Sequence, residues 1–243
     1  MRSAIELHAR KTRGYEARVA HAVALLREAA EDHAGTIVQS SSLGVEGMVL
    51  TDMIARHRLG IPVATLDTGR LHAETRALIP AIHQRYGIEV QVYAPRQEAV
   101  LHFVRRHGED AMFESVELRR ACCDTRKLEP MKRLLEGRSA WVTGLRREQS
   151  EARSTVPFFE IDAEGREKFY PLADWSEADI WHYVSVNEVP YNELHDRFFP
   201  SIGCAPCTRA VSLGEDPRSG RWWWEGEGVR ECGLHLRPEK AVA

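Results

Sequence analysis

Short apolar runs that alternate with longer helical stretches are the feature that most constrains how this chain folds. Apolar positions recur at helical spacing between these runs, so each intervening stretch is predicted to form a helix. Strands that alternate with helices are typical of a mostly parallel sheet flanked by helices, which is the α/β class. The predicted strands cover residues 36–39, 62–66, 90–93 and 140–143. The predicted helices cover residues 15–33, 45–58, 72–86, 97–107, 118–135 and 177–187.

The regular pattern weakens after residue 158. From residue 203 onward the chain is rich in glycine, proline and charged residues, which predicts largely irregular structure. A chain of 243 residues is long enough to bury one sizeable core. We therefore predict a single domain over residues 1–243, with a mobile C-terminal tail over about residues 210–243. The sequence does not determine the oligomeric state, and a homo-oligomer stays among the alternatives.

Charge and hydropathy exclude several classes of protein. The chain has 33 basic and 36 acidic residues, a formal net charge of −3, and so lacks the basic footprint of nucleic-acid or membrane-surface binding. The first thirty residues carry charges throughout, and no apolar stretch approaches the length of a membrane-spanning helix. We expect a cytoplasmic protein with no nucleic-acid or membrane partner.

Polar turns follow the first, second and fourth predicted strands. Ser40, Ser41 and Ser42 join the first strand to the next helix, where hydroxyls and free backbone N–H groups suit a phosphate or sulfate. The alternative is that these serines only cap the helix. Ligands of parallel sheets bind at the carboxyl ends of the strands, so these turns predict the site.

Four of the five cysteines fall into two pairs. Cys122 and Cys123 are adjacent on a predicted helix, and Cys204 and Cys207 form a Cys-x-x-Cys pair. An odd number of unevenly spaced cysteines favours metal or catalytic chemistry over a disulfide framework. Four thiolates from two loci can enclose a metal centre, but their spacing does not separate zinc from an iron–sulfur cluster. The alternative for the adjacent pair is that both are buried apolar residues.

The fifth cysteine, Cys232, lies in the glycine-rich tail with His235 three residues later. Such a thiol is either a nucleophile favoured by neighbouring cations or an incidental surface group. Basic residues flank the cysteine pairs and the turns, and this placement favours a small polyanionic substrate. These basic residues include Arg126, Lys127, Arg146, Arg147, Arg218 and Arg221.

Taken together, these motifs resemble the adenylyl-sulfate and 3′-phosphoadenylyl-sulfate reductase family, within the adenine nucleotide α hydrolases. The resemblance covers about residues 35–235. The matching motifs include Ser-Ser-Ser-Leu-Gly-Val-Glu at residues 40–46, Leu-Asp-Thr-Gly at 66–69, Cys-Cys-x-x-Arg-Lys at 122–127, Thr-Gly-Leu-Arg-Arg at 143–147, Gly-Cys-x-x-Cys-Thr at 203–208, Arg-Trp-Trp-Trp-Glu at 221–225 and Glu-Cys-Gly-Leu-His at 231–235.

The resemblance implies a reaction and a cofactor. Family members with both cysteine pairs bind a [4Fe–4S] cluster and generally use adenosine 5′-phosphosulfate rather than the 3′-phosphorylated substrate. Cys232 is implied as the nucleophile that forms an S-sulfonate and expels AMP. Thioredoxin or a similar dithiol protein is then implied as the partner that releases sulfite. The implied cluster ligands are Cys122, Cys123, Cys204 and Cys207.

The resemblance also assigns roles around the substrate. Ser40, Ser41 and Ser42 would seat the sulfate or phosphate, and Leu66 the adenine. Lys127 would lie between cluster and substrate, and His235 would position the tail or the sulfonate. The arginines that would bind the substrate anion are Arg126, Arg146, Arg147, Arg218 and Arg221.

Three alternatives stay open at the level of sequence. The first is reduction of 3′-phosphoadenylyl sulfate. The second is an ATP-dependent enzyme of the same superfamily, against which Ser41 and Ser42 argue because they replace the glycines of the usual Ser-Gly-Gly-x-Asp-Ser loop. The third is a non-catalytic scaffold in which the four paired cysteines hold zinc and Cys232 is incidental.

Overall fold

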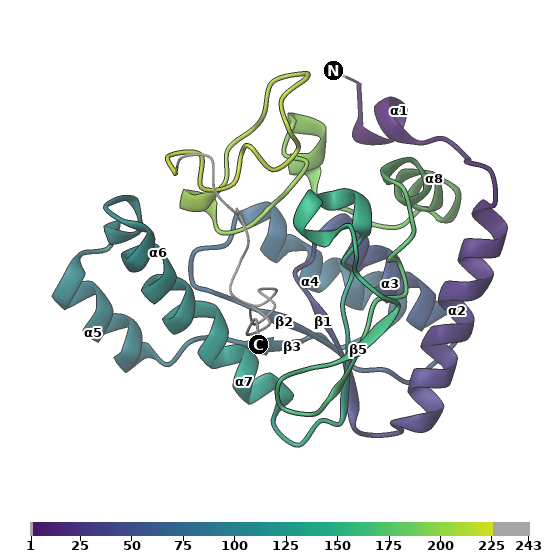
Figure 1. Ribbon diagram of the computed structural model, residues 1–243, viewed down its shortest axis with the longest axis horizontal. Coiled ribbons are helices and arrows are strands. Elements are labelled where there is room, and N and C mark those ends of the chain that lie inside the picture. The colour runs from purple at the N-terminus through teal and green to yellow at the C-terminus, as the bar shows by residue number, and fades with distance from the viewer. Residues whose placement is uncertain (1, 226–243) are drawn as a thin grey trace, which may run out of the picture.

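The fold is a six-stranded sheet between layers of helices, seen in a computed structural model that describes residues 2–225 (Figure 1). The strand order is β3-β2-β1-β4-β6-β5, and every neighbouring pair is parallel except β5 with β6. The predicted α/β class is therefore confirmed. The strands are β1 (Ile37–Ser41), β2 (Val63–Leu66), β3 (Gln91–Tyr93), β4 (Ala140–Val142), β5 (Phe159–Ile161) and β6 (Glu167–Phe169).

Eight α-helices and six shorter helical turns accompany this sheet within residues 2–225. The α-helices are α1 (Ala4–His8), α2 (Tyr15–Asp32), α3 (Val45–Arg56), α4 (Ala73–Tyr86), α5 (Gln97–His107), α6 (Val116–Cys123), α7 (Glu129–Leu135) and α8 (Glu177–Asn187). The shorter turns are η1 (Ala111–Phe113), η2 (Asp124–Leu128), η3 (Arg147–Gln149), η4 (Glu151–Arg153), η5 (Glu193–Arg197) and η6 (Ala205–Cys207). No helix in this part of the chain is both long and apolar enough to cross a membrane.

The two faces of the sheet are covered by different helices because side chains alternate along each strand. Ile37 of β1 packs in the large core formed with α2, α3, α4 and α8. Its neighbour Val38 packs on the opposite face with Trp141 of β4 and Leu134 of α7. Both faces of the central strands are therefore buried, which explains why these strands are apolar runs rather than alternating ones.

The predicted helix at 118–135 is instead α6, η2 and α7 in succession. In η2 the backbone widens to a π-helical turn, and the N–H of Glu129 donates to the carbonyl of Asp124 five residues earlier. Pro130 follows at once and has no N–H for the helical ladder, so the regular pattern is interrupted at this point. Such wide turns often mark functional sites, and this one contains Arg126 and Lys127.

The antiparallel hairpin of β5 and β6 extends the sheet beyond the predicted strands. Its strands are only three residues long, and Phe159 and Ile161 are more than half exposed, so no buried apolar run reveals them. Part of the predicted tail is ordered against the body. The N–H of Val211 donates to the carbonyl of Phe198, and Trp222 is buried. Mobility of residues 210–243 stays a prediction, because residues 226–243 lie outside the described residues.

Candidate active site

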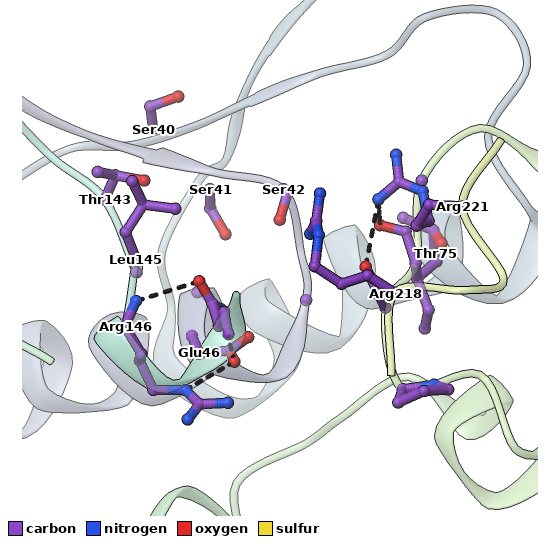
Figure 2. A pocket seen from close by; sticks show the side chains of 18 of the residues that line it. Ser40, Ser41, Ser42, Glu46, Thr75, Thr143, Leu145, Arg146, Arg218 and Arg221 are labelled. Carbon is purple, nitrogen blue, oxygen red and sulfur yellow. Dashed lines mark hydrogen bonds and ion pairs between the residues drawn. The ribbon is translucent and has the colours of Figure 1, made fainter. Parts of the chain in front are cut away.

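The main cavity lies at the carboxyl ends of β1 and β4, where the connections leave the sheet in opposite directions. Its volume is about 440 Å³. The turns after β1, β2 and β4 line it, as the sequence predicts, and so does the chain from Pro200 onward. In Figure 2 the Ser40–Ser42 turn and Arg146 lie on one side, and Arg218 and Arg221 lie on the other. Predicted substrate-binding residues that line it are Ser40, Ser41, Ser42, Leu66, Arg146, Arg218 and Arg221, and Lys127, which is predicted to lie between cluster and substrate, lines it as well.

The serine turn is packed tightly on the first turn of α3. The Oγ of Ser41 accepts a hydrogen bond of 3.1 Å from the N–H of Leu43. Leu43 is fully buried and adopts left-handed backbone (φ 58°), a strained conformation for a branched residue that persists only where the surroundings fix it. A Cβ on Gly47 of α3 would lie 2.5 Å from the Ser41 Oγ. The turn is thus held in one shape before a ligand binds.

A buried ion pair joins the turn after β4 to α3. The Nε of Arg146 donates to the Oε1 of Glu46 at 3.0 Å, and the amide of Gln149 donates to the same oxygen at 2.9 Å (Figure 2). Burial alone raises the pKa of Glu46, but the Arg146 charge and the hydrogen bonds outweigh it and hold that pKa below its ordinary value. Because residue 144 is a glycine, the turn after β4 can lie this close to α3. A Cβ at that position would lie 2.7 Å from the Glu46 Cβ.

The predicted arginines are not equivalent in this structure. Arg146 lines the cavity, but Glu46 and Glu148, each at 3.0 Å, already neutralise it. Arg147 does not line either cavity: it donates to the carbonyl of Val156 at 2.8 Å and stacks on Phe158. Arg126 donates to the carbonyl of Thr68 at 2.9 Å and lines a second, smaller cavity.

Arg221 is a predicted arginine that lines the main cavity, where its guanidinium lies 4.7 Å from the ring centroid of Trp222. It is 7% exposed and has no ion pair with a carboxylate of residues 2–225. Its Nη1 makes only long contacts, 3.4 Å to Ser201 Oγ and 3.5 Å to the Ile202 carbonyl, and its buried Nε has no partner there. A Cβ on Gly203 would overlap the guanidinium, so glycine makes room for it. A buried, incompletely paired cation in a cavity is suited to an anionic ligand.

The second cavity is lined by all four paired cysteines, although their two loci are far apart in sequence. Cys122, Cys204 and Cys207 are buried, and Cys123 is partly exposed. Burial and the neighbouring Cys204 raise the pKa of the Cys207 thiol to about 11. Thiols in such surroundings become thiolates when a metal binds them, since metal ligation displaces the proton. Cationic side chains surround the same cavity, namely Arg70, Arg119, Arg126 and Lys127.

Several cavity residues were not predicted from sequence. Glu46 ends the motif at residues 40–46 and Gln149 lies two residues after the motif at 143–147, but only the fold shows that they share Arg146. His195 of η5 lines the cavity, and burial lowers the pKa of its imidazole to about 4, so the ring is neutral near pH 7. Trp222 lines both cavities. No periodicity or spacing signals the last two, because each depends on a long-range contact. Predicted residues Cys232 and His235 lie outside the described residues.

Fold and site together define an α/β protein with a ligand cavity at the topological switch point of its sheet and a cysteine-lined cavity beside it. The model of the phosphoadenosine phosphosulfate reductase domain matches residues 36–210. The adenosine 5′-phosphosulfate reductase of Allochromatium vinosum is 52% identical over 221 residues, which cover 90% of this chain and 86% of that protein. The protein of that name from Neisseria meningitidis serogroup A is 52% identical over 198 residues, 81% of each chain. The chain therefore belongs to the phosphoadenosine phosphosulfate reductase family.

Solved structures agree with this assignment. The phosphoadenylyl-sulfate reductase of Candida auris, in a phosphate complex, has a TM-score of 0.65 and 26% sequence identity, and covers 82% of this chain and 98% of that chain. The FMN adenylyltransferase of Candida glabrata, bound to FMN and an ATP analogue, shares the fold alone. Its TM-score is 0.53 at 17% identity, covering 83% of this chain and 71% of that chain.

Proposed function

We propose that this chain reduces adenosine 5′-phosphosulfate to sulfite and AMP in sulfate assimilation, using thiols as the reductant. The observation that carries the proposal is the set of relatives named adenosine 5′-phosphosulfate reductase, which are about 50% identical over most of the chain. The incompletely paired Arg221 in the main cavity suits the phosphosulfate anion.

The substrate would lie across the carboxyl ends of the strands. The Ser40–Ser42 turn and the start of α3 supply hydroxyls and N–H groups for the phosphate or sulfate, and Leu66 would contact the adenine. Arg218 and Arg221 reach into the cavity from the chain after Pro200, across from the Ser40–Ser42 turn (Figure 2). Both would stabilise the charge that moves onto AMP as it leaves.

The reaction is proposed to run in two displacements at Cys232. Its thiolate attacks the sulfate sulfur, a sulfur–sulfur bond forms, and the sulfur–oxygen bond breaks so that AMP leaves with the electron pair. A thiolate of thioredoxin, or of a similar dithiol protein, then attacks Cys232 Sγ and expels sulfite. The second thiol of that protein resolves the mixed disulfide, restoring Cys232 and oxidising the dithiol. His235 is proposed to position the sulfonate or the tail.

The second cavity is proposed to hold a [4Fe–4S] cluster. Four cysteine sulfurs are the donor set that such clusters take, and the surrounding cations suit its anionic sulfurs. Cys122, Cys123, Cys204 and Cys207 would be the ligands. When bound, the cluster supplies a fixed charge and structural support, since four cysteines leave no iron open to substrate. Lys127 lines both cavities and would link their charges.

A zinc-binding scaffold is less well supported. The relatives that are about 50% identical are named as reductases, and the chain has a substrate-sized cavity beside the cysteines that a scaffold does not need.

Metal content is the first expected outcome. Protein purified without oxygen should contain iron and acid-labile sulfide, each close to four per chain, and should be brown. Cys207→Ser should lose most of both, because one of the four ligands is removed. Stoichiometric zinc without sulfide would contradict the cluster and favour the scaffold.

Substrate choice is the second expected outcome, and it tests the proposed activity. Adenosine 5′-phosphosulfate should give a higher kcat/KM for sulfite release than 3′-phosphoadenylyl sulfate, with thioredoxin as reductant. The reverse ranking would assign the chain to the users of the 3′-phosphorylated substrate. Release of AMP from ATP without sulfite formation would instead support an ATP-dependent enzyme of the superfamily.

A further inference from the structure

Arg119 and Cys123 lie one helical turn apart on α6, which ends at Cys123. Residues four positions apart on a helix lie on the same face, so these two side chains are neighbours. Both line the cysteine cavity, and Arg119 is 3% exposed. The next residue, Arg120, is exposed and does not line either cavity. The helix therefore directs one of its two adjacent arginines to the cysteines.

Glu225 holds the guanidinium of Arg119 in place. The Nε of Arg119 donates to Oε1 of Glu225 at 2.5 Å, and its Nη2 donates to Oε2 at 3.1 Å. The side chains of Arg119 and Glu225 are 4% and 13% exposed, so water and salt screen their charges weakly. The same guanidinium lies 4.6 Å from the ring centroid of Trp222. A fixed positive charge and a fixed negative charge thus lie together at the wall of the cysteine cavity.

The Arg119 charge also acts on the sulfur of Cys123. Burial alone lowers the pKa of Arg119, but Glu225 and the Cys123 thiolate outweigh it and hold that pKa above its ordinary value. Cys123 is partly exposed, whereas the other three cysteines of the cavity are buried. The guanidinium therefore stands beside the cavity cysteine that lies closest to solvent.

We propose that Arg119 and Glu225 set the electrostatic potential at the Cys123 side of the cluster. Arg119 stabilises the negative charge of the cluster there, and Glu225 limits this stabilisation. The inference rests on the proposed function, because it takes the four cysteines as ligands of a [4Fe–4S] cluster.

The midpoint potential of the cluster measures this effect. One-electron reduction makes a cluster with four thiolate ligands more negative, so a nearby positive charge raises the potential and a nearby negative charge lowers it. Reduction of the cluster is not a step of the proposed reaction, and the potential serves only as a measure of the local charge. The readout is therefore independent of sulfite production.

The test compares two variants that each remove one charge and keep a polar side chain. Arg119→Gln should lower the equilibrium constant for one-electron reduction at least about tenfold, which is a fall of about 59 mV in midpoint potential. Glu225→Gln should shift the potential in the opposite direction. Arg119→Lys keeps the charge, so its potential should lie closer to the wild type than that of Arg119→Gln. Titration with europium(II) chelates in the absence of oxygen, followed by electron paramagnetic resonance, measures all three.

Arg120→Gln is the matched control. Arg120 is next to Arg119 on the same helix and has the same charge, but it is exposed to water and does not line the cavity. Screening by solvent should keep the equilibrium constant for reduction of this variant within about twofold of the wild type.

Two results would overturn the inference. The first is the same potential in Arg119→Gln and Arg120→Gln. The second is a Glu225→Gln potential at or below that of the wild type, because a merely structural pair gives no shifts of opposite sign. If Arg119→Gln does not retain its iron, the upward shift in Glu225→Gln and the potential of Arg119→Lys still decide. A wild-type protein without iron and sulfide would remove the proposed cluster itself, whereas the first two results leave it intact.

Discussion

Replacement of Cys232 by serine should abolish sulfite production while leaving the rest of the protein intact. A serine hydroxyl is a far weaker nucleophile than a thiolate near neutral pH, so turnover should fall at least about 10³-fold. Sulfite release with thioredoxin measures this loss. Cys232 is not among the four proposed cluster ligands, so iron content should not change. AMP should bind with wild-type affinity.

The informative comparison is with Cys123→Ser. That residue lines the cysteine cavity, so its replacement should lower iron content as well as activity. Cys232→Ser should lose turnover and keep its iron, whereas Cys123→Ser should lose both. This contrast separates the nucleophile from the cluster ligands. Substantial sulfite production by Cys232→Ser would contradict the mechanism.

Replacement of Arg221 by alanine should have the second largest effect. Its guanidinium is buried in the main cavity with only long hydrogen bonds and no carboxylate partner among residues 2–225. Removing one hydrogen-bond donor to the negative charge that develops in the transition state typically lowers the rate about a hundred- to a thousandfold. We therefore expect kcat/KM to fall by about that factor. Steady-state kinetics with adenosine 5′-phosphosulfate measures it.

Two controls make this result specific. Arg209 also lies in the chain after Pro200, is paired with Glu215 and does not line the cavity, so Arg209→Ala should keep kcat/KM within about twofold. Arg221→Lys keeps the charge but not the planar fork, so it should fall between alanine and wild type. Equal activity of Arg221→Ala and Arg209→Ala would show that Arg221 does not contact the substrate anion.

The central fold could be predicted because its signals are local. Buried parallel strands are continuous apolar runs, and helices repeat their apolar positions, so the boundaries of β1 and α3 fall within a few residues of the prediction. The helix α5 at Gln97–His107 matches its predicted range. The β5–β6 hairpin could not be predicted in this way, because its strands are short and partly exposed at the edge of the sheet.

The site was predictable as a set of residue types but not as an arrangement. Strand ends and motifs direct attention to Ser40–Ser42, Arg146 and Arg221, which do line the cavity. Whether an arginine is neutralised depends on partners distant in sequence. Glu46 compensates Arg146 across 100 residues, whereas Arg147, its neighbour, turns away toward Phe158. The pairing of Arg119 with Glu225 has no local signal for the same reason.

The central claim, covalent catalysis by Cys232, is tested most directly by mass spectrometry. Protein incubated with adenosine 5′-phosphosulfate and no reductant should gain one SO₃ group, about 80 Da, on the peptide that contains Cys232. Addition of reduced thioredoxin should remove this mass and release an equal amount of sulfite. A protein that turns over with thioredoxin but shows no adduct, or that carries it on another cysteine, would contradict the account.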